Sequence, residues 1–360
     1  MTPTTSREAV LSVAVATVLL FAATTVLNNA YRGTRRARAE RQYRAGVQLA
    51  SAGRNAQAAD DFRAALVYEH DNADYRLALA KSLIAQEQFG EAQTHLVDLR
   101  DADPTDGPVN LMLARIAARE NRDADAVTDY HRAIYGFWPD HPEQNRISAR
   151  FELIGVLERD HQQKQVLAEL LELAGELPDS DVDHRQEVAS MLLSHGSLQH
   201  AAEVFRAIVA ARPSDAAAQQ GLGEAEFQLS DFVAARQAFQ MAAQVEPSNL
   251  DVQQHLAACD AVIDLDPTLV RLSANQRFMR AQTLLNRTLD SAERCGVVPA
   301  GLSEQAQKAL AEKPRRKRDG DTVDILMLSQ QVWRQRLQGC PKRAPTDQAL
   351  AAVMSKLAKQ

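Results

Sequence analysis

The sequence predicts an all-α fold: an α-solenoid of about six helical hairpins, with a long apolar helix before it and a helical appendage after it. Composition gives the first indication, because 45% of the 360 residues are hydrophobic, only 5% are aromatic, and no alternating β-branched run occurs. The second indication is a set of small and apolar residues that returns about every 34 residues. The net charge of −6 is modest for this length and favours neither a nucleic-acid binder nor an acidic tail.

The recurring pattern is clearest in Ala216–Ser248. Small and apolar residues there fall on one face of each of two expected helices, with a polar turn at Ser230 between them. Gly223 is expected where the two helices cross, because only a small residue lets their backbones approach closely. Phe239 is expected to fill the space that remains, and Pro247 to end the second helix.

The same residue classes recur throughout residues 39–249, which we interpret as one array of hairpins. Successive sets begin at Gly46, Ala80, Ala114, Ile154, Ala189 and Gly223. In the last set only Glu226 falls outside the expected class. The pattern resembles that of the tetratricopeptide repeat family. This resemblance implies a right-handed superhelix in which the first helix of each hairpin lines a concave groove that receives peptides or segments of partner proteins.

Carrying the groove positions over from the family gives a set of candidate partner-binding residues. These are Arg44, Lys81, Arg115 and Arg119 in the amino-terminal half, and Glu187 and Glu224 farther along. A groove that is basic early and acidic late could orient a dipolar partner, although solvated surface charge is the default for each residue. Some family members hold a carboxyl-terminal peptide with paired Lys and Asn residues, and this sequence departs from that pattern. The departing positions are Tyr43, Val47, Leu77, Lys81, Leu111 and Arg115.

A longer loop interrupts the repeat at residues 135–146 and contains Trp138. Such a loop is a common place for function. Because Phe137 and Trp138 stand where the repeat expects its closing Pro, we expect them to pack against the next hairpin.

Residues 1–31 read as a polar tail followed by a membrane anchor. Ala9–Leu27 carries no charge and is long enough to cross a bilayer as a helix. A cleaved signal peptide is the alternative, but residues 28–30 match a cleavage site poorly. Residues 32–38 form a basic juxtamembrane linker, and by the positive-inside rule their arginines favour a cytoplasmic location for the repeats of a single-pass protein.

The cysteines point to the opposite side of that membrane. Cys295 and Cys340 lie at expected helix ends, and a disulfide between them would favour the oxidising periplasm. Two free surface thiols are an equal alternative. Cys259 lies in an apolar helical run and is expected to be a buried free thiol.

After the array, residues 250–265 are expected to form a capping helix over the last hairpin. Residues 268–360 do not match the repeat and are expected to form a helical appendage. Its loop at residues 313–318 holds a basic patch made of Arg315, Arg316, Lys317 and Arg318. A solvated loop is the ordinary interpretation of that patch, and binding of an anionic ligand or a membrane surface is the functional one.

Signatures of enzymes, cofactors and metals are weak in this sequence. His195 and His200 have no neighbouring Cys, and the glycines Gly221 and Gly223 follow no expected strand. We therefore expect no enzyme activity, no cofactor, no metal and no nucleic acid. The leading hypothesis is a membrane-anchored scaffold that binds a protein or peptide partner in its groove, during assembly of an envelope complex. The alternative is anionic-ligand or membrane-surface binding by the basic appendage, with the repeats as a spacer.

Overall fold

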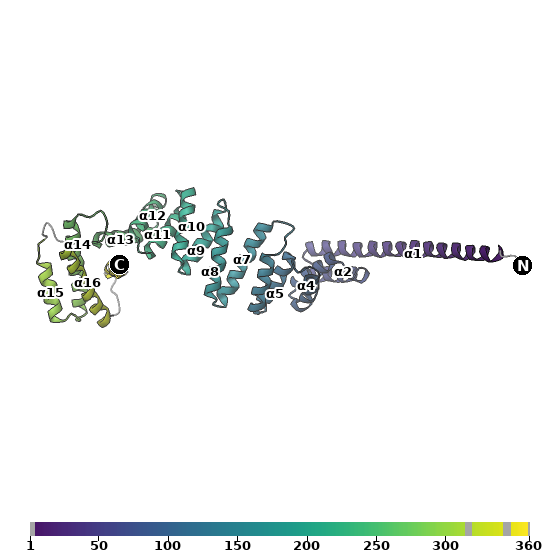
Figure 1. The fold of residues 1–360 in the computed structure, drawn as a ribbon, viewed down its shortest axis with the longest axis horizontal. Helices are drawn as coiled ribbons and strands as arrows, with labels where there is room; N and C mark the ends of the chain where they lie inside the picture. Colours follow the sequence, from purple (N-terminus) through teal and green to yellow (C-terminus); the bar gives the residue numbers. More distant parts are fainter. Residues whose placement is uncertain (1–3, 314–318, 341–346, 359–360) are drawn as a thin grey trace. The chain divides into compact units, whose positions relative to one another are not determined.

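The protein is all-α in the computed structural model, which describes residues 4–313, 319–340 and 347–358, without the side chains of residues 4–10, 12, 13, 15, 319 and 320 (Figure 1). These residues form 17 helices and no strand. The chain divides into two compact units, Met1–Glu169 (unit 1) and Leu170–Gln360 (unit 2). The predicted solenoid of helical hairpins is therefore confirmed as an all-helical, solenoid-like fold.

Unit 1 is a series of antiparallel helical hairpins. Its helices are α1 (Thr4–Ser51), α2 (Asn55–Tyr68), α3 (Ala73–Ile84), α4 (Phe89–Ala102), α5 (Gly107–Arg119), α6 (Asp123–Ile134) and α7 (Pro142–Arg159). Each of these helices packs on the next one along the chain. Polar caps start two of them, because the Asn72 and Asp106 side chains accept hydrogen bonds from the backbone N–H groups of Tyr75 and Val109. Helix α8 (Gln163–Glu176) spans the boundary between the units.

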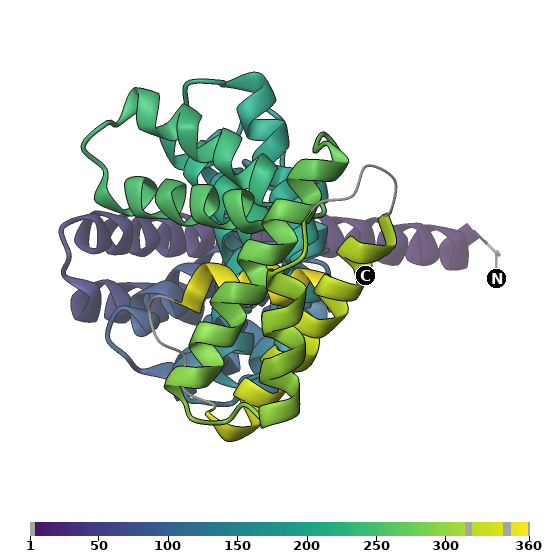
Figure 2. The ribbon, with the colours of Figure 1, turned by 90° about the vertical axis from the view of Figure 1, so that its left-hand side faces the viewer.

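Unit 2 continues with hairpins and ends in a different helical arrangement. Its helices are α9 (Val182–Ser194), α10 (Leu198–Ala211), α11 (Ala216–Gln228), α12 (Phe232–Val245), α13 (Leu250–Leu265), α14 (Ala274–Arg294), α15 (Ala300–Leu310), α16 (Asp319–Gly339) and α17 (Gln348–Leu357). Helices α9–α13 pack in sequence order. The long helices α14 and α16 lie side by side, and α17 packs on α13 (Figure 2).

Close helix crossings are made by Gly and Phe in both units. A Cβ atom added to Gly46 would lie 2.6 Å from the Phe62 ring, and one added to Gly223 would lie 2.8 Å from the Phe239 ring. Both rings are at most 1% exposed. Each ring therefore occupies the volume that a side chain at the glycine would need, which confirms the role predicted for Gly223 and Phe239.

Glu226, the one residue outside the repeat pattern in the last hairpin, is buried as an ion pair. It is 6% exposed and accepts a hydrogen bond of 3.1 Å from Nε of Arg206 on the neighbouring hairpin. The carboxylate is tolerated in this interface because the guanidinium compensates its desolvation.

Trp138 packs within its own hairpin. The ring is 7% exposed and lies against Gly107, where an added Cβ would be 2.6 Å away, and its Nε1–H donates to the Ala133 carbonyl at 2.8 Å. The expectation that Trp138 packs against the next hairpin stays a prediction, because these contacts are with α5 and α6 of its own hairpin. The same expectation for Phe137 is wrong: its side chain is exposed, and only its backbone is held, by hydrogen bonds to Thr105 and Gly107.

The predicted membrane anchor is contradicted. Residues 9–27 lie within α1, which continues without interruption into the first hairpin. Among the residues that the structure describes, no helix is long and apolar enough to cross a membrane. The single-pass localisation in the cell membrane is therefore not supported and is corrected here.

We expect Gly46→Ala to destabilise the protein by about 1–3 kcal/mol, because the new methyl group overlaps the buried Phe62 ring. Gly155→Ala is the matched control. Gly155 lies inside α7 of the same unit with nothing within 4 Å of an added Cβ, so the substitution should stabilise by about 0.5–1 kcal/mol. Urea unfolding followed by circular dichroism measures both. Equal shifts for the two variants would contradict the close crossing.

Cys295 and Cys340 are bonded in the structure, with Cα atoms 6.0 Å apart and a sequence separation of 45 residues. Loop closure of that length predicts that reduction destabilises unit 2 by about 4 kcal/mol. Melting with and without a dithiol measures this, and the Cys295→Ser/Cys340→Ser variant should not respond to the dithiol. Titration of the unfolded, unreduced chain should find only the Cys259 thiol; reaction of all three cysteines would rule the bond out.

Candidate protein-binding groove

Two adjoining cavities lie along the first helices of the hairpins in unit 1. The first has a volume of about 300 Å³ and is lined by Tyr43 and Val47 of α1 and by Leu77 of α3. The second has a volume of about 480 Å³ and is lined by Leu111 of α5, among others. Lys81 of α3 lines both cavities, so they meet at its side chain. We call this pair of cavities the unit 1 groove.

The floor of the groove is apolar and the positions of its side chains are fixed. Tyr43 stacks on Tyr75 with ring centroids 4.7 Å apart, and the Tyr75 hydroxyl donates to Glu40 at 3.2 Å. Burial, and then the bond to Glu40, raise the pKa of Tyr75 to about 12, so it is neutral at physiological pH. In the second cavity, Met112 and Trp138 complete the apolar surface around Leu111. The groove can therefore accept apolar side chains at two neighbouring places.

The three predicted cations that line the groove differ in their partners. Arg115 makes two hydrogen bonds to Glu152 of α7, of 2.6 and 2.8 Å, and Glu152 also accepts from the Tyr130 hydroxyl at 3.0 Å. The Arg119 guanidinium lies 5.8 Å from the centroid of the Phe89 ring. Arg119 and Lys81 are exposed and make no ion pair with any described residue. Lys81 and Arg119 thus remain available to an anionic group, whereas the charge of Arg115 is compensated.

The other predicted groove residues lie outside these cavities. Arg44 is exposed and pairs with Glu40 at 2.7 Å, one turn away on α1. Glu187 and Glu224 are on α9 and α11 of unit 2, where Glu187 is exposed and Glu224 is half-buried. They remain predictions as partner-binding residues. Sequence reasoning missed Met112 and Trp138 as lining residues. Met112 lies on α5 beside the predicted Leu111 position, whereas Trp138 lies in a loop that the family pattern does not place.

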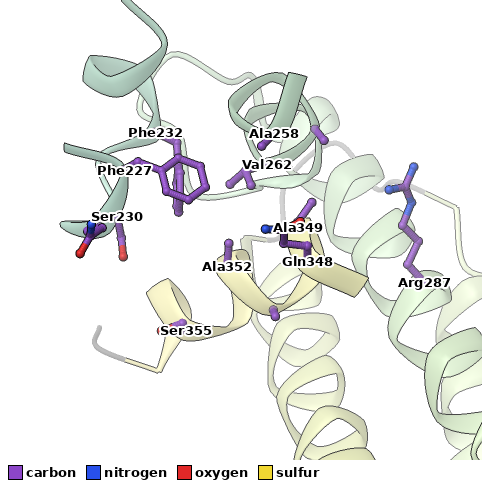
Figure 3. Close-up of a pocket in the computed structure, with 13 residues that line it drawn as sticks. Phe227, Ser230, Phe232, Ala258, Val262, Arg287, Gln348, Ala349, Ala352 and Ser355 are labelled. Carbon is purple, nitrogen blue, oxygen red and sulfur yellow. The ribbon is translucent and has the colours of Figure 1, made fainter. Parts of the chain in front are cut away.

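Unit 2 has a larger apolar cavity, of about 760 Å³, between the last hairpin and the carboxyl-terminal helix (Figure 3). Phe227 and Phe232 come from the end of α11 and the start of α12, and Val262 from α13. Ala349 and Ala352 of α17 lie on the other side. Arg287 of α14 is the one charged residue in its described lining.

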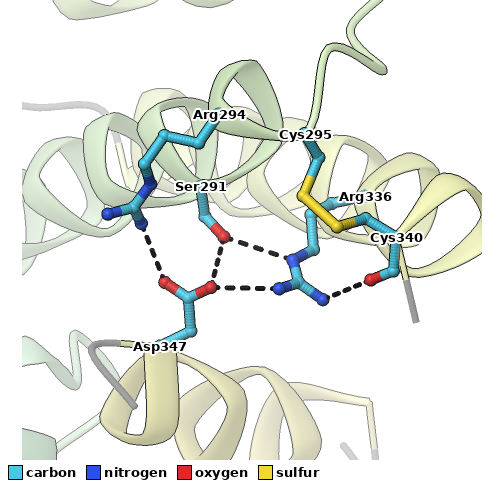
Figure 4. The surroundings of a disulfide bond; sticks show 6 residues. All are labelled: Ser291, Arg294, Cys295, Arg336, Cys340 and Asp347. Atoms are coloured by element: carbon cyan, nitrogen blue, oxygen red, sulfur yellow. Dashed lines mark hydrogen bonds and ion pairs between the residues drawn. A yellow bond between two sulfur atoms is a disulfide. The ribbon is translucent and has the colours of Figure 1, made fainter. Parts of the chain in front are cut away.

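Close to the disulfide, a buried ionic cluster joins α14, α16 and the start of α17 (Figure 4). The Asp347 carboxylate is 3% exposed and accepts hydrogen bonds from Arg336 at 3.1 Å, Arg294 at 3.0 Å and the Ser291 hydroxyl at 2.7 Å. Arg336 also donates to the carbonyl of Cys340 at 2.6 Å. Asp347 stands at the N-cap position of α17, but its side chain makes no capping hydrogen bond and bonds instead to these distant groups, which no local sequence pattern could show.

The basic patch of Arg315, Arg316, Lys317 and Arg318 lies outside the described residues, so its role stays a prediction. Among the described residues, no group of three or more His, Cys, Asp or Glu side chains is placed to bind a metal ion.

Two segments of the chain match models of the tetratricopeptide repeat, residues 49–116 and residues 189–249. No curated protein matches the sequence. Among solved structures, YrrB, described as a TPR protein with an unusual peptide-binding site, is 17% identical, with 54% of this chain and 97% of that chain covered and a TM-score of 0.40. Pseudomonas aeruginosa pilF is 16% identical, with 62% and 99% covered and a TM-score of 0.39. A tetratricopeptide repeat protein from Parabacteroides merdae is 12% identical, with 81% and 98% covered and a TM-score of 0.39.

Likeness at these identities and TM-scores says nothing about what this chain binds. The repeat fold itself is typically a non-catalytic scaffold, and tetratricopeptide repeat proteins generally mediate protein–protein interactions. The matched segments lie one in each unit, and both consist of the helical hairpins described above. One segment in each unit therefore resembles the tetratricopeptide repeat.

Proposed function

We propose that the protein is a scaffold that binds a segment of a partner protein in the unit 1 groove. The observation that carries this proposal is the meeting of two largely apolar cavities, the first with Asp74 also in its lining, at an exposed Lys81 that has no ion pair among the described residues. Apolar surface supplies binding free energy, and an uncompensated cation gives orientation and selectivity.

The groove chemistry fits a segment with two apolar side chains that flank an acidic residue. One apolar side chain would occupy the cavity of Tyr43 and Leu77, and the other the cavity of Leu111 and Trp138. The acidic group between them would face Lys81. Arg119 lines the second cavity and extends the positive rim, because its contact with Phe89 leaves its charge uncompensated.

The partner is a protein segment, because the repeats of this fold generally mediate protein–protein interaction. Two cavities joined along three successive hairpins suit an extended chain that places side chains at intervals better than they suit one compact ligand. The carboxyl-terminal clamp of some family members is not required for this binding, since the ligand's acidic side chain, and not its terminus, would contact Lys81.

We expect peptides selected from a random displayed library on the full-length chain to be enriched in acidic residues flanked by large apolar ones. Their affinity, measured by fluorescence anisotropy, should fall at least tenfold in the Lys81→Glu/Arg119→Glu variant, because attraction becomes repulsion. Rising salt should weaken binding to the wild-type protein. Arg54→Glu/Arg212→Glu, at exposed positions before α2 and after α10, is the charge-matched control and should change affinity less than twofold. Unchanged affinity in the double variant would refute the proposal.

Arg115 is expected to stabilise the groove without binding the partner, because Glu152 compensates its charge. A double-mutant cycle of Arg115→Met and Glu152→Gln should give a coupling of about 1 kcal/mol in urea unfolding, since both side chains are partly exposed. Arg115→Met should leave peptide affinity within about twofold in the same anisotropy assay. A loss as large as that of the Lys81→Glu/Arg119→Glu variant would instead make Arg115 a contact residue.

A further inference from the structure

Helix α17 packs on an apolar surface that the other helices of unit 2 form. We call this surface the α17 docking surface; it is made of Phe232, Val262, Leu265, Leu284 and Trp333, from α12, α13, α14 and α16. The α17 side chains that pack on it recur at helical spacing and are buried. They are Leu350, Val353, Met354 and Leu357. The contact is therefore that of an amphipathic helix lying on an apolar surface.

The surface carries opposite charges at its two ends. At the start of α17, Arg336 and Arg294 hold the buried carboxylate of Asp347 (Figure 4). At the end of α17, Lys356 pairs at 2.6 Å with Asp266, which is 1% exposed. The docking surface thus selects a helix with an acidic residue at its start and a lysine near its end, and it fixes the direction in which that helix lies.

The same surface is incompletely filled by α17. The cavity of about 760 Å³ lies where Ala349 and Ala352 face Phe227 and Phe232 across an open space (Figure 3). This pocket is open to solvent, so the apolar side chains on its two walls remain partly in contact with water. A helix with larger apolar side chains at these two positions would bury more surface than α17 does.

We propose that the α17 docking surface is an interaction site for an amphipathic helix of a partner protein, and that α17 is its intramolecular occupant. The partner helix carries an acidic residue at its start, apolar residues at the spacing of Leu350, Val353, Met354 and Leu357, and a lysine near its end. It differs from α17 in having large apolar residues in place of Ala349 and Ala352. It binds by replacing α17, whose high effective concentration it must overcome.

The test uses a fluorescent peptide of residues 347–358 that carries Ala349→Leu and Ala352→Leu, titrated into the full-length, disulfide-bonded protein and followed by anisotropy. We expect it to bind at least tenfold more tightly than the peptide of natural sequence, because leucine side chains fill the cavity. A peptide that also carries Met354→Asp should not bind, since its apolar face is interrupted.

Leu350→Ala in the full-length protein tests whether α17 and the peptide compete for the docking surface. This change weakens the resident α17 and leaves every residue of the docking surface intact, so affinity for the labelled peptide should rise at least tenfold. Val323→Ala removes an exposed side chain on α16 and should leave the affinity unchanged. If Leu350→Ala impairs folding by circular dichroism, Lys356→Gln, which loosens the other end of α17, takes its place.

Two outcomes would overturn the proposal: no binding of the leucine peptide to the variant with weakened α17, or equal binding whether or not α17 is weakened. A second measurement is independent of the peptide. Full-length Ala349→Leu/Ala352→Leu should melt at a higher temperature than wild type and bind less peptide, because α17 then fills its own cavity. A lower melting temperature would show that the cavity cannot accept these side chains.

Discussion

The close crossing of paired helices, with a phenylalanine ring packed on a glycine, is the constraint on which the rest of this structure depends. At Gly46 and Gly223 the ring of Phe62 or Phe239 occupies the volume that any side chain would need. The ring is then fully buried, and a side chain at the glycine position would not fit between the helices. Because this contact joins residues close in sequence, each hairpin can form locally, and larger surfaces arise when hairpins stack.

Stacking explains why the unit 1 groove has both an apolar floor and a charged rim. The first helix of each hairpin buries one face against its own partner helix and leaves another toward the groove, where Leu77 and Leu111 lie beside Lys81. Whether such a cation can bind a ligand depends on what the neighbouring hairpin supplies. Glu152, from α7, compensates Arg115. No described residue does the same for Lys81, and that difference decides which of two similar side chains is available.

The periodic part of this fold could be predicted from the sequence, because hairpin formation and the Gly–Phe crossings depend on residues a few turns apart. Pairings between distant segments could not be predicted from the sequence. The residues around Asp347, for example, do not indicate that its carboxylate pairs with Arg294 and Arg336. The difference between Lys81 and Arg44, which family positions had ranked alike, is instead local: Glu40 lies one turn before Arg44 on α1 and pairs with it, which the sequence already showed. The predicted anchor at residues 9–27 rested on the length of an uncharged apolar stretch, and among the residues that the structure describes no helix is long and apolar enough to cross a membrane.

At the end of a repeat array the repeat pattern no longer determines how the helices pack, and unit 2 is an example. The last repeat has no following hairpin, so its apolar surface must be covered by helices of another pattern. Helix α17 does so with buried charges at both ends, although a carboxylate such as Asp347 is stable in an apolar contact only when its partners are in place. Such pairs add little net stability, yet they fix direction and register. The ion pairs at the two ends of α17 fix its direction, and a cavity stays open beside Ala349 and Ala352. These two features are more typical of a recognition surface than of a close-packed core.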